Sequence, residues 1–252
     1  MSRCLGLPTL SIDFLKATGF EFDVVGSSIE GGRNAYGETI SIGITGGGLV
    51  RGSYDFIVHE PEQVEYINWL GARLNSSTRF INVPIRSDFA GPFPIVNEEP
   101  APFITGIPHS DGALFSDGAG YSQATVWGRV RGATHLNAGQ MEIEIVGNTR
   151  NLRWSDWFSI YHGTKKGWRA YRFWQASDPT SSTVAMPDGT SYPGQRYTVS
   201  IAPALREYVP NFTPIEFARP RFVAKFPVDF TLPFRADLMN RDRPTIQFVE
   251  AF

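Results

Sequence analysis

The side chains that could contact a ligand gather between positions 153 and 174, where aromatic residues are interleaved with basic ones. Aromatic rings stack on sugars and on nucleic-acid bases, and they anchor protein interfaces. The same rings could instead fill the core of a β-barrel and leave the basic residues on its surface. The sequence leaves these alternatives open. The candidate residues for an interface or a ligand platform are Trp154, Trp157, Tyr161, Trp168, Tyr171 and Trp174.

No arrangement typical of a catalytic or cofactor-binding site stands out in the sequence. There is no Gly-x-Ser-x-Gly element for a nucleophilic serine. The four histidines, at positions 59, 109, 135 and 162, share no spacing of metal ligands. Cys4 is the single cysteine, which excludes an internal disulfide and a cysteine-rich zinc or iron–sulfur centre. We therefore predict a protein that is not an enzyme and that needs no catalytic residue, cofactor or metal.

Two acidic pairs have simpler structural interpretations. Asp111 and Asp117 each precede a glycine in a repeated Ser-Asp-Gly-Ala motif. They could offer oxygens to calcium, but the dense acidic ligands of a calcium loop are missing, so Asx-type turns are predicted. Glu142 and Glu144 could form an acid/base pair, but they alternate with apolar residues. This alternation predicts the solvent face of a strand.

The glycine-rich motifs favour turns over phosphate binding. The segment Gly163-Thr-Lys-Lys-Gly167 lacks the spacing of a phosphate loop and predicts the tip of a hairpin. Gly31-Gly32 and the run Gly46–Gly48 are predicted to be turns or loops between strands.

Composition favours a β protein without a broad basic face. The 23 basic and 25 acidic residues nearly cancel, which argues against nucleic-acid binding through charge alone. The 25 Gly and 18 Pro residues interrupt helices and supply turns, and 19 Phe residues suit pleated surfaces. The first residues lack the apolar core of a signal peptide, and no stretch approaches the roughly 20 apolar residues of a membrane span. We expect a soluble chain without membrane insertion.

The first third of the chain predicts a sheet with one helix. Phe20, Phe22 and Val24 alternate with acidic residues, which is the period of a strand with one buried face. Residues 61–74 place apolar side chains at helical spacing behind a proline that suits the first turn. Residues 80–85 read as the next strand. Five prolines between positions 89 and 108 then predict an extended linker and a domain boundary.

The rest of the chain predicts a second β unit. Short strands are expected at 124–131, 141–147, 157–161, 168–174, 197–201, 215–218 and 222–226. A long polar loop is expected at 178–194, broken by a possible hairpin turn at Pro187-Asp-Gly189. The last residues form a strand that must pair with something, and the first unit is a natural acceptor. The predicted fold is therefore mainly β: a β-sandwich-like domain of residues 1–95 and 219–252 with one packed helix, and an inserted small β-barrel-like domain of residues 96–218.

Three passages of the sequence resemble the distal tail proteins of long-tailed phages. The first is the strand–helix–strand run from Gly52 to Pro84, which includes Phe-Ile-Asn-Val-Pro (80–84). The second is the glycine-rich turn His-Ser-Asp-Gly-Ala-Leu-Phe-Ser-Asp-Gly-Ala-Gly-Tyr (109–121). The third is Phe-Ala-Arg-Pro-Arg-Phe-Val-Ala-Lys-Phe (217–226), which leads to Thr-Ile-Gln-Phe-Val-Glu-Ala (245–251).

The resemblance implies a structural virion protein in the phage tail. Such proteins form a ring of identical copies, usually six, that joins the tail tube to the tail-tip hub and the other baseplate proteins. DNA would be only a passing cargo, and assembly would take place in the host cytoplasm. The resemblance implies no catalytic residue. This chain departs from the simplest pattern between positions 150 and 196, which leaves the role of the inserted domain open. A carbohydrate-binding β domain that recognises host surface glycans is the main alternative, and a β hydrolase is a third.

Overall fold

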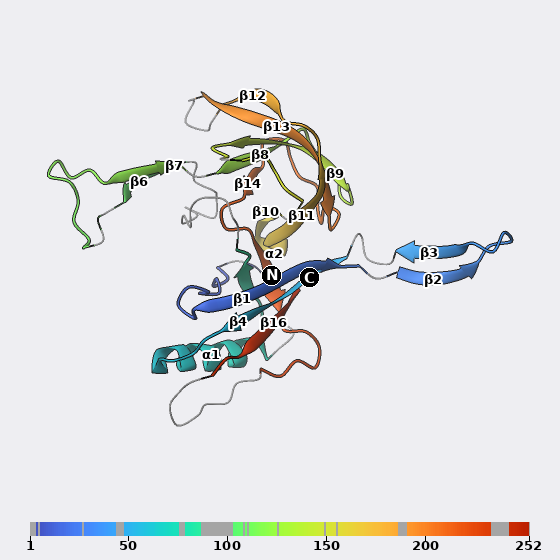
Figure 1. The fold of residues 1–252 in the computed structure, drawn as a ribbon, viewed down its shortest axis with the longest axis horizontal. Coiled ribbons are helices and arrows are strands. Elements are labelled where there is room, and N and C mark those ends of the chain that lie inside the picture. The colour runs from blue at the N-terminus through green and yellow to red at the C-terminus, as the bar shows by residue number, and fades with distance from the viewer. Residues whose placement is uncertain are drawn as a thin grey trace.

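The computed structural model shows a mainly β chain that consists of an open five-stranded sheet and a closed six-stranded barrel (Figure 1). The fold class predicted from the sequence is confirmed. The structure describes residues 4, 6–26, 28–43, 48–75, 79–86, 103–107, 109, 111–124, 126–148, 150–154, 156–185, 191–232 and 242–251. Within these ranges, no helix has both the length and the apolar character needed to cross a membrane.

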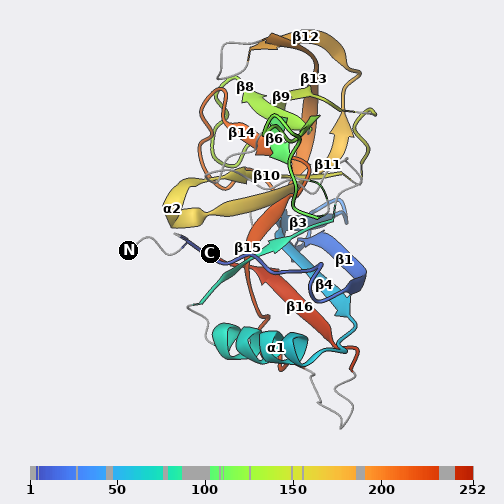
Figure 2. The ribbon, with the colours of Figure 1, turned by 90° about the vertical axis from the view of Figure 1, so that its left-hand side faces the viewer.

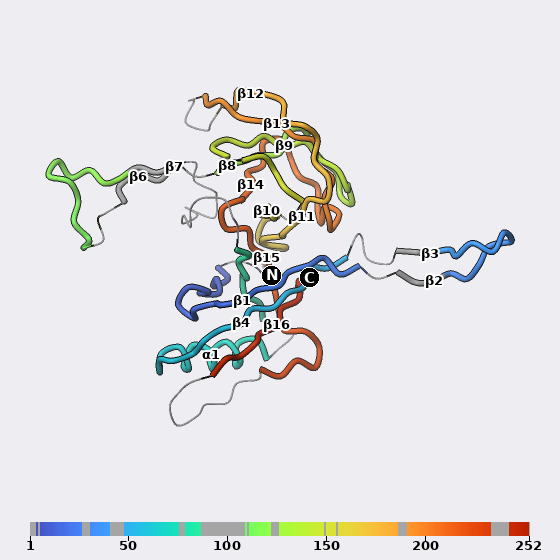
Figure 3. The backbone as a smooth tube through the Cα atoms, viewed as in Figure 1, coloured from blue at the N-terminus to red at the C-terminus, as the bar shows by residue number. Residues whose placement is uncertain are grey.

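The open sheet takes its strands from both ends of the chain. All neighbouring strands are antiparallel, in the order β1-β4-β16-β15-β5. In Figure 3 the red C-terminal strand β16 lies beside the blue-to-cyan strand β4, so the predicted pairing of the last strand with the first unit is confirmed. The strands are β1 (Ala17–Val25), β4 (Leu49–Phe56), β5 (Ile81–Pro84), β15 (Arg221–Lys225) and β16 (Thr245–Glu250).

One face of this sheet is apolar, and helix α1 (Pro61–Leu74) packs in its core. The register pairs Tyr54 of β4 with Ile246 of β16. Both side chains are buried in one cluster with Ile67 of the helix. The helix has the predicted bounds. Its start is fixed by the buried Gln63, whose side-chain oxygen accepts a hydrogen bond from the backbone N–H of His59 (2.9 Å).

The barrel is formed by the part of the chain between β5 and β15. Its strands follow the order β11-β10-β14-β8-β9-β13, and pairing of β11 with β13 closes the ring of strands. The strands are β8 (Trp127–Arg131), β9 (Gln140–Val146), β10 (Trp157–Tyr161), β11 (Trp168–Ala176), β13 (Ser191–Ala202) and β14 (Pro214–Glu216). Whether the two predicted residue ranges fold as separate domains stays a prediction.

Alternate side chains of the barrel strands point inward and form a second apolar core. The core is tight near Gly128, where an added Cβ would overlap the ring of Phe217. A short helix, α2 (Gly163–Lys166), connects β10 to its antiparallel neighbour β11. The predicted hairpin tip at this position is therefore confirmed.

The prediction of a long polar loop at 178–194 is wrong. The segment contains β12 (Thr180–Ala185) and the first part of β13, which pair as an antiparallel hairpin. The residues of the possible hairpin turn, 187–189, lie outside the described residues. Figure 1 shows this hairpin rising beyond the barrel. One face of β12 is exposed at Ser181, Thr183 and Ala185, and the other is covered only at Val184 and partly at Ser182, so the segment shows little alternation of apolar and polar residues.

Two further ribbons extend from the body on opposite sides (Figure 1). One consists of β2 (Ser28–Arg33) and β3 (Thr39–Gly43), and the other of β6 (Phe103–Ile107) and β7 (Tyr121–Ala124). The predicted turn at Gly31-Gly32 is wrong, because both glycines lie within β2. A bulge occurs there instead, and Gly32 has a φ of +90°. Gly46, Gly47 and most of the predicted proline-rich linker lie outside the described residues.

The sheet and the barrel are joined by a buried ionic contact. The Glu250 carboxylate at the end of β16 lies 3.2 Å from Arg169 of β11 and 3.1 Å from Arg206, which follows β13. Arg206 also donates to the carbonyl of Gly48 just before β4. In Figure 2 the sheet lies between helix α1 at the bottom and the barrel at the top.

Candidate functional site

The six candidate aromatic residues occupy three different environments. The antiparallel register of β10 and β11 sets this division, since adjacent residues of a strand point to opposite sides of the barrel wall. Tyr171 points inward, where its ring stacks 5.4 Å from that of Phe158. Its hydroxyl lies 2.8 Å from Nε2 of His162. Tyr171 is therefore a core residue of the barrel.

Trp157, Tyr161 and Trp168 lie on the outer side of the same wall. Trp157 is buried in the apolar cluster of the open sheet. The guanidinium of Arg221, on strand β15, lies 4.3 Å from the ring centroid of Trp168, and the ring of Tyr161 lies 5.4 Å from the same indole. These contacts connect the barrel to the sheet.

Trp154 and Trp174 are the exposed members of the set. Trp154 is 74% exposed and Trp174 is 59% exposed. The structure thus gathers the six residues into no common platform. Two of them face solvent at the surface, and the other four are largely enclosed.

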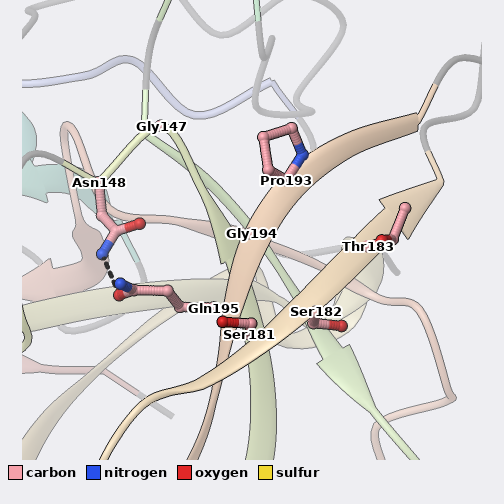
Figure 4. Close-up of a pocket in the computed structure, with 8 residues that line it drawn as sticks. All are labelled: Gly147, Asn148, Ser181, Ser182, Thr183, Pro193, Gly194 and Gln195. Carbon is pink, nitrogen blue, oxygen red and sulfur yellow. Dashed lines mark hydrogen bonds between the residues drawn. The ribbon is translucent and has the colours of Figure 1, made fainter.

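A polar pocket lies at the mouth of the barrel, where the β12–β13 hairpin rises above it (Figure 4). Its volume is about 620 Å³. The side chains that line it carry hydroxyl and amide groups, and no charged or aromatic residue is among them. The lining residues are Gly147, Asn148, Ser181, Ser182, Thr183, Pro193, Gly194 and Gln195.

Hydrogen bonds fix the floor of this pocket. Nδ2 of Asn148 donates to Oε1 of Gln195 at 2.7 Å, which is the dashed line in Figure 4. The hydroxyl of Tyr197, from the top of the barrel core, donates to the same oxygen. Asn148 also donates to the carbonyl of Arg150 (3.1 Å), which ties the floor to the loop that follows.

This loop, from Asn148 to Asp156, is held by a salt bridge. The two terminal nitrogens of Arg150 donate to the two carboxylate oxygens of Asp156, each at 2.7 Å. A bidentate pair of this kind fixes orientation as well as distance. The backbone N–H of Arg153 donates to the same carboxylate (2.7 Å). The loop therefore presents Trp154 from a braced backbone.

The expectation that Glu144 lies on a solvent face is wrong. Its side chain is completely buried on the outer wall of the barrel, beneath β12. It accepts hydrogen bonds from Arg129 (2.9 Å), Arg131 and Ser182. Burial acts to raise the pKa of Glu144, but these hydrogen bonds together outweigh it and hold the pKa below its usual range. The sequence shows the strand alternation, but it does not show that the β12–β13 hairpin covers Glu144.

His162 is another titratable group whose pKa is shifted in the folded chain. It lines a cavity of about 270 Å³ beside α2. Burial, with the nearby charges of Arg169 and Lys166, lowers the pKa of His162 to about 3. The imidazole is therefore neutral at physiological pH and serves as a hydrogen-bond partner of Tyr171.

The repeated Ser-Asp-Gly-Ala motif forms two successive turns, as predicted. Oδ1 of Asp111 accepts from the N–H of Ala113 (3.0 Å), and Oδ1 of Asp117 accepts from the N–H of Ala119 (2.9 Å). Among the described residues, no group of three or more His, Cys, Asp or Glu side chains is placed to hold a metal ion.

The two edges of the open sheet differ. At the β5 edge, the chain's own N-terminal segment adds a short parallel contact. The N–H of Leu10 donates to the carbonyl of Asn82 (2.8 Å), and the N–H of Asn82 donates to the carbonyl of Pro8 (2.9 Å). At the other edge, β1 pairs with β4 on one side, and no strand within the described ranges pairs with its second side. On β1, Phe20 is 52% exposed.

Comparison with known proteins adds no relative. No protein-family model matches the sequence, and no curated protein sequence matches it significantly.

Proposed function

We propose that this chain is a structural subunit of a phage tail, a distal tail protein that forms a ring between the tail tube and the tail tip. The three passages that resemble this family support the proposal. The fold is compatible with it, since the passage from Gly52 to Pro84 forms β4, α1 and β5 around one core. The site of action would be the virion, after assembly in the host cytoplasm.

The open edge of β1 is the observation that carries the proposal. The second side of this nine-residue strand pairs with no strand of the described ranges, and an unpaired strand edge is a template for pairing with another chain. Natural proteins cover or blunt such edges, and this chain covers the opposite edge with its own residues 8–10. The uncovered edge therefore suits a contact that forms only in the assembly.

A ring requires that each copy offer two different, complementary surfaces. The β1 edge would be one of them. The β2–β3 ribbon could supply the second, because it continues the β1–β4 pair and extends beyond the body (Figure 1). Tyr36, near its tip, is 91% exposed. In such a ring the partners are copies of the same chain, the tail tube protein and the tip proteins, and DNA passes through the lumen without base contacts.

Labelling of particles tests the proposal. Antibodies raised against the purified chain and coupled to gold would be applied to tailed particles from the source culture and imaged by negative staining. We expect label at the distal end of the tail tube, at the junction with the tip. Label on the capsid, or intact tails with no label while a tail tube antibody binds, would contradict the proposal.

The alternative of a carbohydrate-binding domain has its own observation in its favour, the polar pocket at the barrel mouth. It need not exclude a structural role, because the pocket belongs to the barrel and the open edge belongs to the sheet.

A further inference from the structure

We propose that the pocket at the barrel mouth binds an uncharged oligosaccharide. The inference does not depend on assembly into a tail, because the lining residues come from β9, β12, β13 and the turn after β9. The mouth of a β-barrel is a common place for a small-molecule site, and about 620 Å³ lies within the usual range for such sites.

The functional groups of the lining match those of a sugar. Nδ2 of Asn148 and Oε1 of Gln195 are used within the floor, so Oδ1 of Asn148 offers an acceptor and Nε2 of Gln195 offers a donor. Ser181 and Thr183 add hydroxyl groups that both donate and accept. Sugar hydroxyls also donate and accept, so each can find a partner at a wall of this kind. No ionisable side chain lines the pocket, so nothing there would compensate the charge of an anionic or cationic ligand.

The arginine cluster around Glu144 faces the other way. In the β12–β13 register, Ser181 pairs with Gln195, whereas Ser182 pairs with Gly194 and Thr180 pairs with Arg196. Side chains of neighbouring positions point to opposite faces of a hairpin. Ser181 and Gln195 lie on one face of the hairpin, whereas the hydroxyl of Ser182, which also borders the pocket (Figure 4), donates to the buried carboxylate of Glu144 at 3.0 Å. The arginine side chains around Glu144 are not among the lining residues of the pocket.

The site is pre-formed. Gln195 accepts from both Asn148 and Tyr197, so its amide orientation is set before any ligand arrives. Gly194 allows β9 and β12 to approach β13 closely, because an added Cβ would lie 2.7 Å from the carbonyl oxygen of Ile145 and 2.8 Å from Cγ2 of Val184. A rigid site loses little conformational entropy on binding, which favours the recognition of weakly bound ligands such as glycans.

Trp154 is not among the lining residues, but the loop that carries it begins at Asn148 on the pocket floor. It follows Asn148 in the loop braced by Arg150 and Asp156, and it is the more exposed of the two surface tryptophans on the barrel. Apolar faces of sugar rings pack on indole rings, and the cost of exposing such a ring to water is offset when a ligand covers it. In this proposal, Trp154 contacts the part of the oligosaccharide that extends out of the pocket.

A glycan array tests the inference with the full-length chain. The labelled protein would be applied to neutral hexose and N-acetylhexosamine oligosaccharides, printed beside their sulfated and uronic-acid counterparts. We expect retention on a subset of neutral glycans. Retention on charged glycans alone, or on none of the printed glycans at the highest protein concentration, would overturn the proposal.

Two variants of strand β12 then locate the site by titration of the best neutral glycan. Ser181→Trp fills the pocket from an exposed position and should weaken binding at least about tenfold, a loss of about 1.4 kcal/mol. Thr180→Trp is the matched control, since it places the same bulk on the opposite face of the same strand. Equal affinity of the two variants would overturn the proposal, provided that both retain the wild-type unfolding temperature.

The tryptophans give an independent comparison. Trp154→Ala should weaken binding several-fold, whereas Trp174→Ala on strand β11 should leave it unchanged. Loss of binding in Trp174→Ala together with normal binding in Ser181→Trp would place the glycan elsewhere and overturn the assignment. Ring formation is measured separately by mass, so failure here does not bear on the tail proposal.

Discussion

Glu250 illustrates how a single carboxylate can hold two units together. Its side chain is completely enclosed, and Arg169 and Arg206 approach it from the barrel while the N–H of Val50 donates to it from the sheet. A buried ion pair of this kind gives little net stability compared with an apolar contact of the same shape. Removing one partner is costly, however, because the remaining charges stay buried without compensation.

We therefore predict that Glu250→Gln lowers the free energy of unfolding by about 3–5 kcal/mol. Urea denaturation followed by tryptophan fluorescence would measure the change. Asp23→Asn is the matched control, since it neutralises the surface pair of Asp23 with Arg172 (2.8 Å), whose side chains are both exposed. The control should cost less than about 1 kcal/mol. Similar losses for the two variants would contradict the role of Glu250.

His162 makes stability depend on pH. Its pKa is about 3 in the folded chain and near its ordinary value of 6.5 in the unfolded chain, so the unfolded chain binds the proton more readily. Stability is therefore lost as the pH falls from about 6.5 towards 3, with a slope approaching 1.4 kcal/mol per pH unit from this group.

In His162→Gln the amide can still bond to the Tyr171 hydroxyl but does not titrate. The difference in unfolding free energy between this variant and the wild type should shrink or reverse in favour of the variant as the pH falls through that window. Comparing the two proteins removes the contributions of Glu144, whose pKa is lowered, and of Glu216, whose pKa is raised by burial, because both groups are common to the two proteins. Parallel pH profiles would show that His162 is not buried in the neutral form.

At the scale of elements, the pairing of β1 with β4 depends on a glycine. Gly52 lies opposite Phe22 in the register, and a Cβ at Gly52 would overlap the Phe22 ring and lie 2.5 Å from the carbonyl oxygen of Glu21. The missing side chain lets that ring fold across the strand and contact Tyr54 and Phe222, at centroid distances of 5.1 and 6.0 Å.

Gly52→Ala should therefore destabilise the sheet by about 1–3 kcal/mol through overpacking. Gly139→Ala, at a position with open space around it, should change stability by less than about 0.5 kcal/mol. Thermal unfolding of both variants would measure the difference. An unchanged unfolding temperature for Gly52→Ala would contradict this prediction, because it would mean that the Phe22 ring can leave its contacts without loss of stability.

The elements most predictable from the sequence are those with one buried face and one face exposed to solvent. The helix at 61–74 buries one face at helical spacing. In the strand around Phe22 the predicted buried face is only partly confirmed, since Phe22 and Val24 are half-buried whereas Phe20 is 52% exposed. β12 shows no clear alternation of apolar and polar residues, since Val184 is its one buried side chain. The burial of Glu144 followed from that hairpin and could not be predicted before the hairpin was known.

The candidate site was only partly predictable for the same reason. The aromatic residues of β10 and β11 were visible as a group, but their distribution between core, sheet contact and surface depends on strand register and on what covers the outer wall. The pocket residues Ser181, Thr183 and Gln195 belong to the segment that was expected to be a loop. Small polar residues look alike in a loop and at a binding site.

At the scale of the whole molecule, buried contacts join the sheet to the barrel, whereas other surfaces are left exposed. Inside, the sheet and the barrel are joined through Glu250 and the outer wall of β10 and β11. Outside, no further strand within the described residues pairs with the open side of β1 or with either ribbon. This division is expected of a rigid building block whose remaining contacts form with other copies.

The mass of the purified protein tests this central claim most directly. Native mass spectrometry would compare the wild type with Phe20→Lys, which adds a charge to the β1 edge, and with Leu136→Lys, a substitution at a similarly exposed apolar residue of the barrel. We predict a closed oligomer, a multiple of 28.0 kDa, for the wild type and Leu136→Lys, and a 28.0 kDa species for Phe20→Lys. A wild type that stays at 28.0 kDa at every concentration, or a Phe20→Lys variant that assembles as Leu136→Lys does, would contradict it.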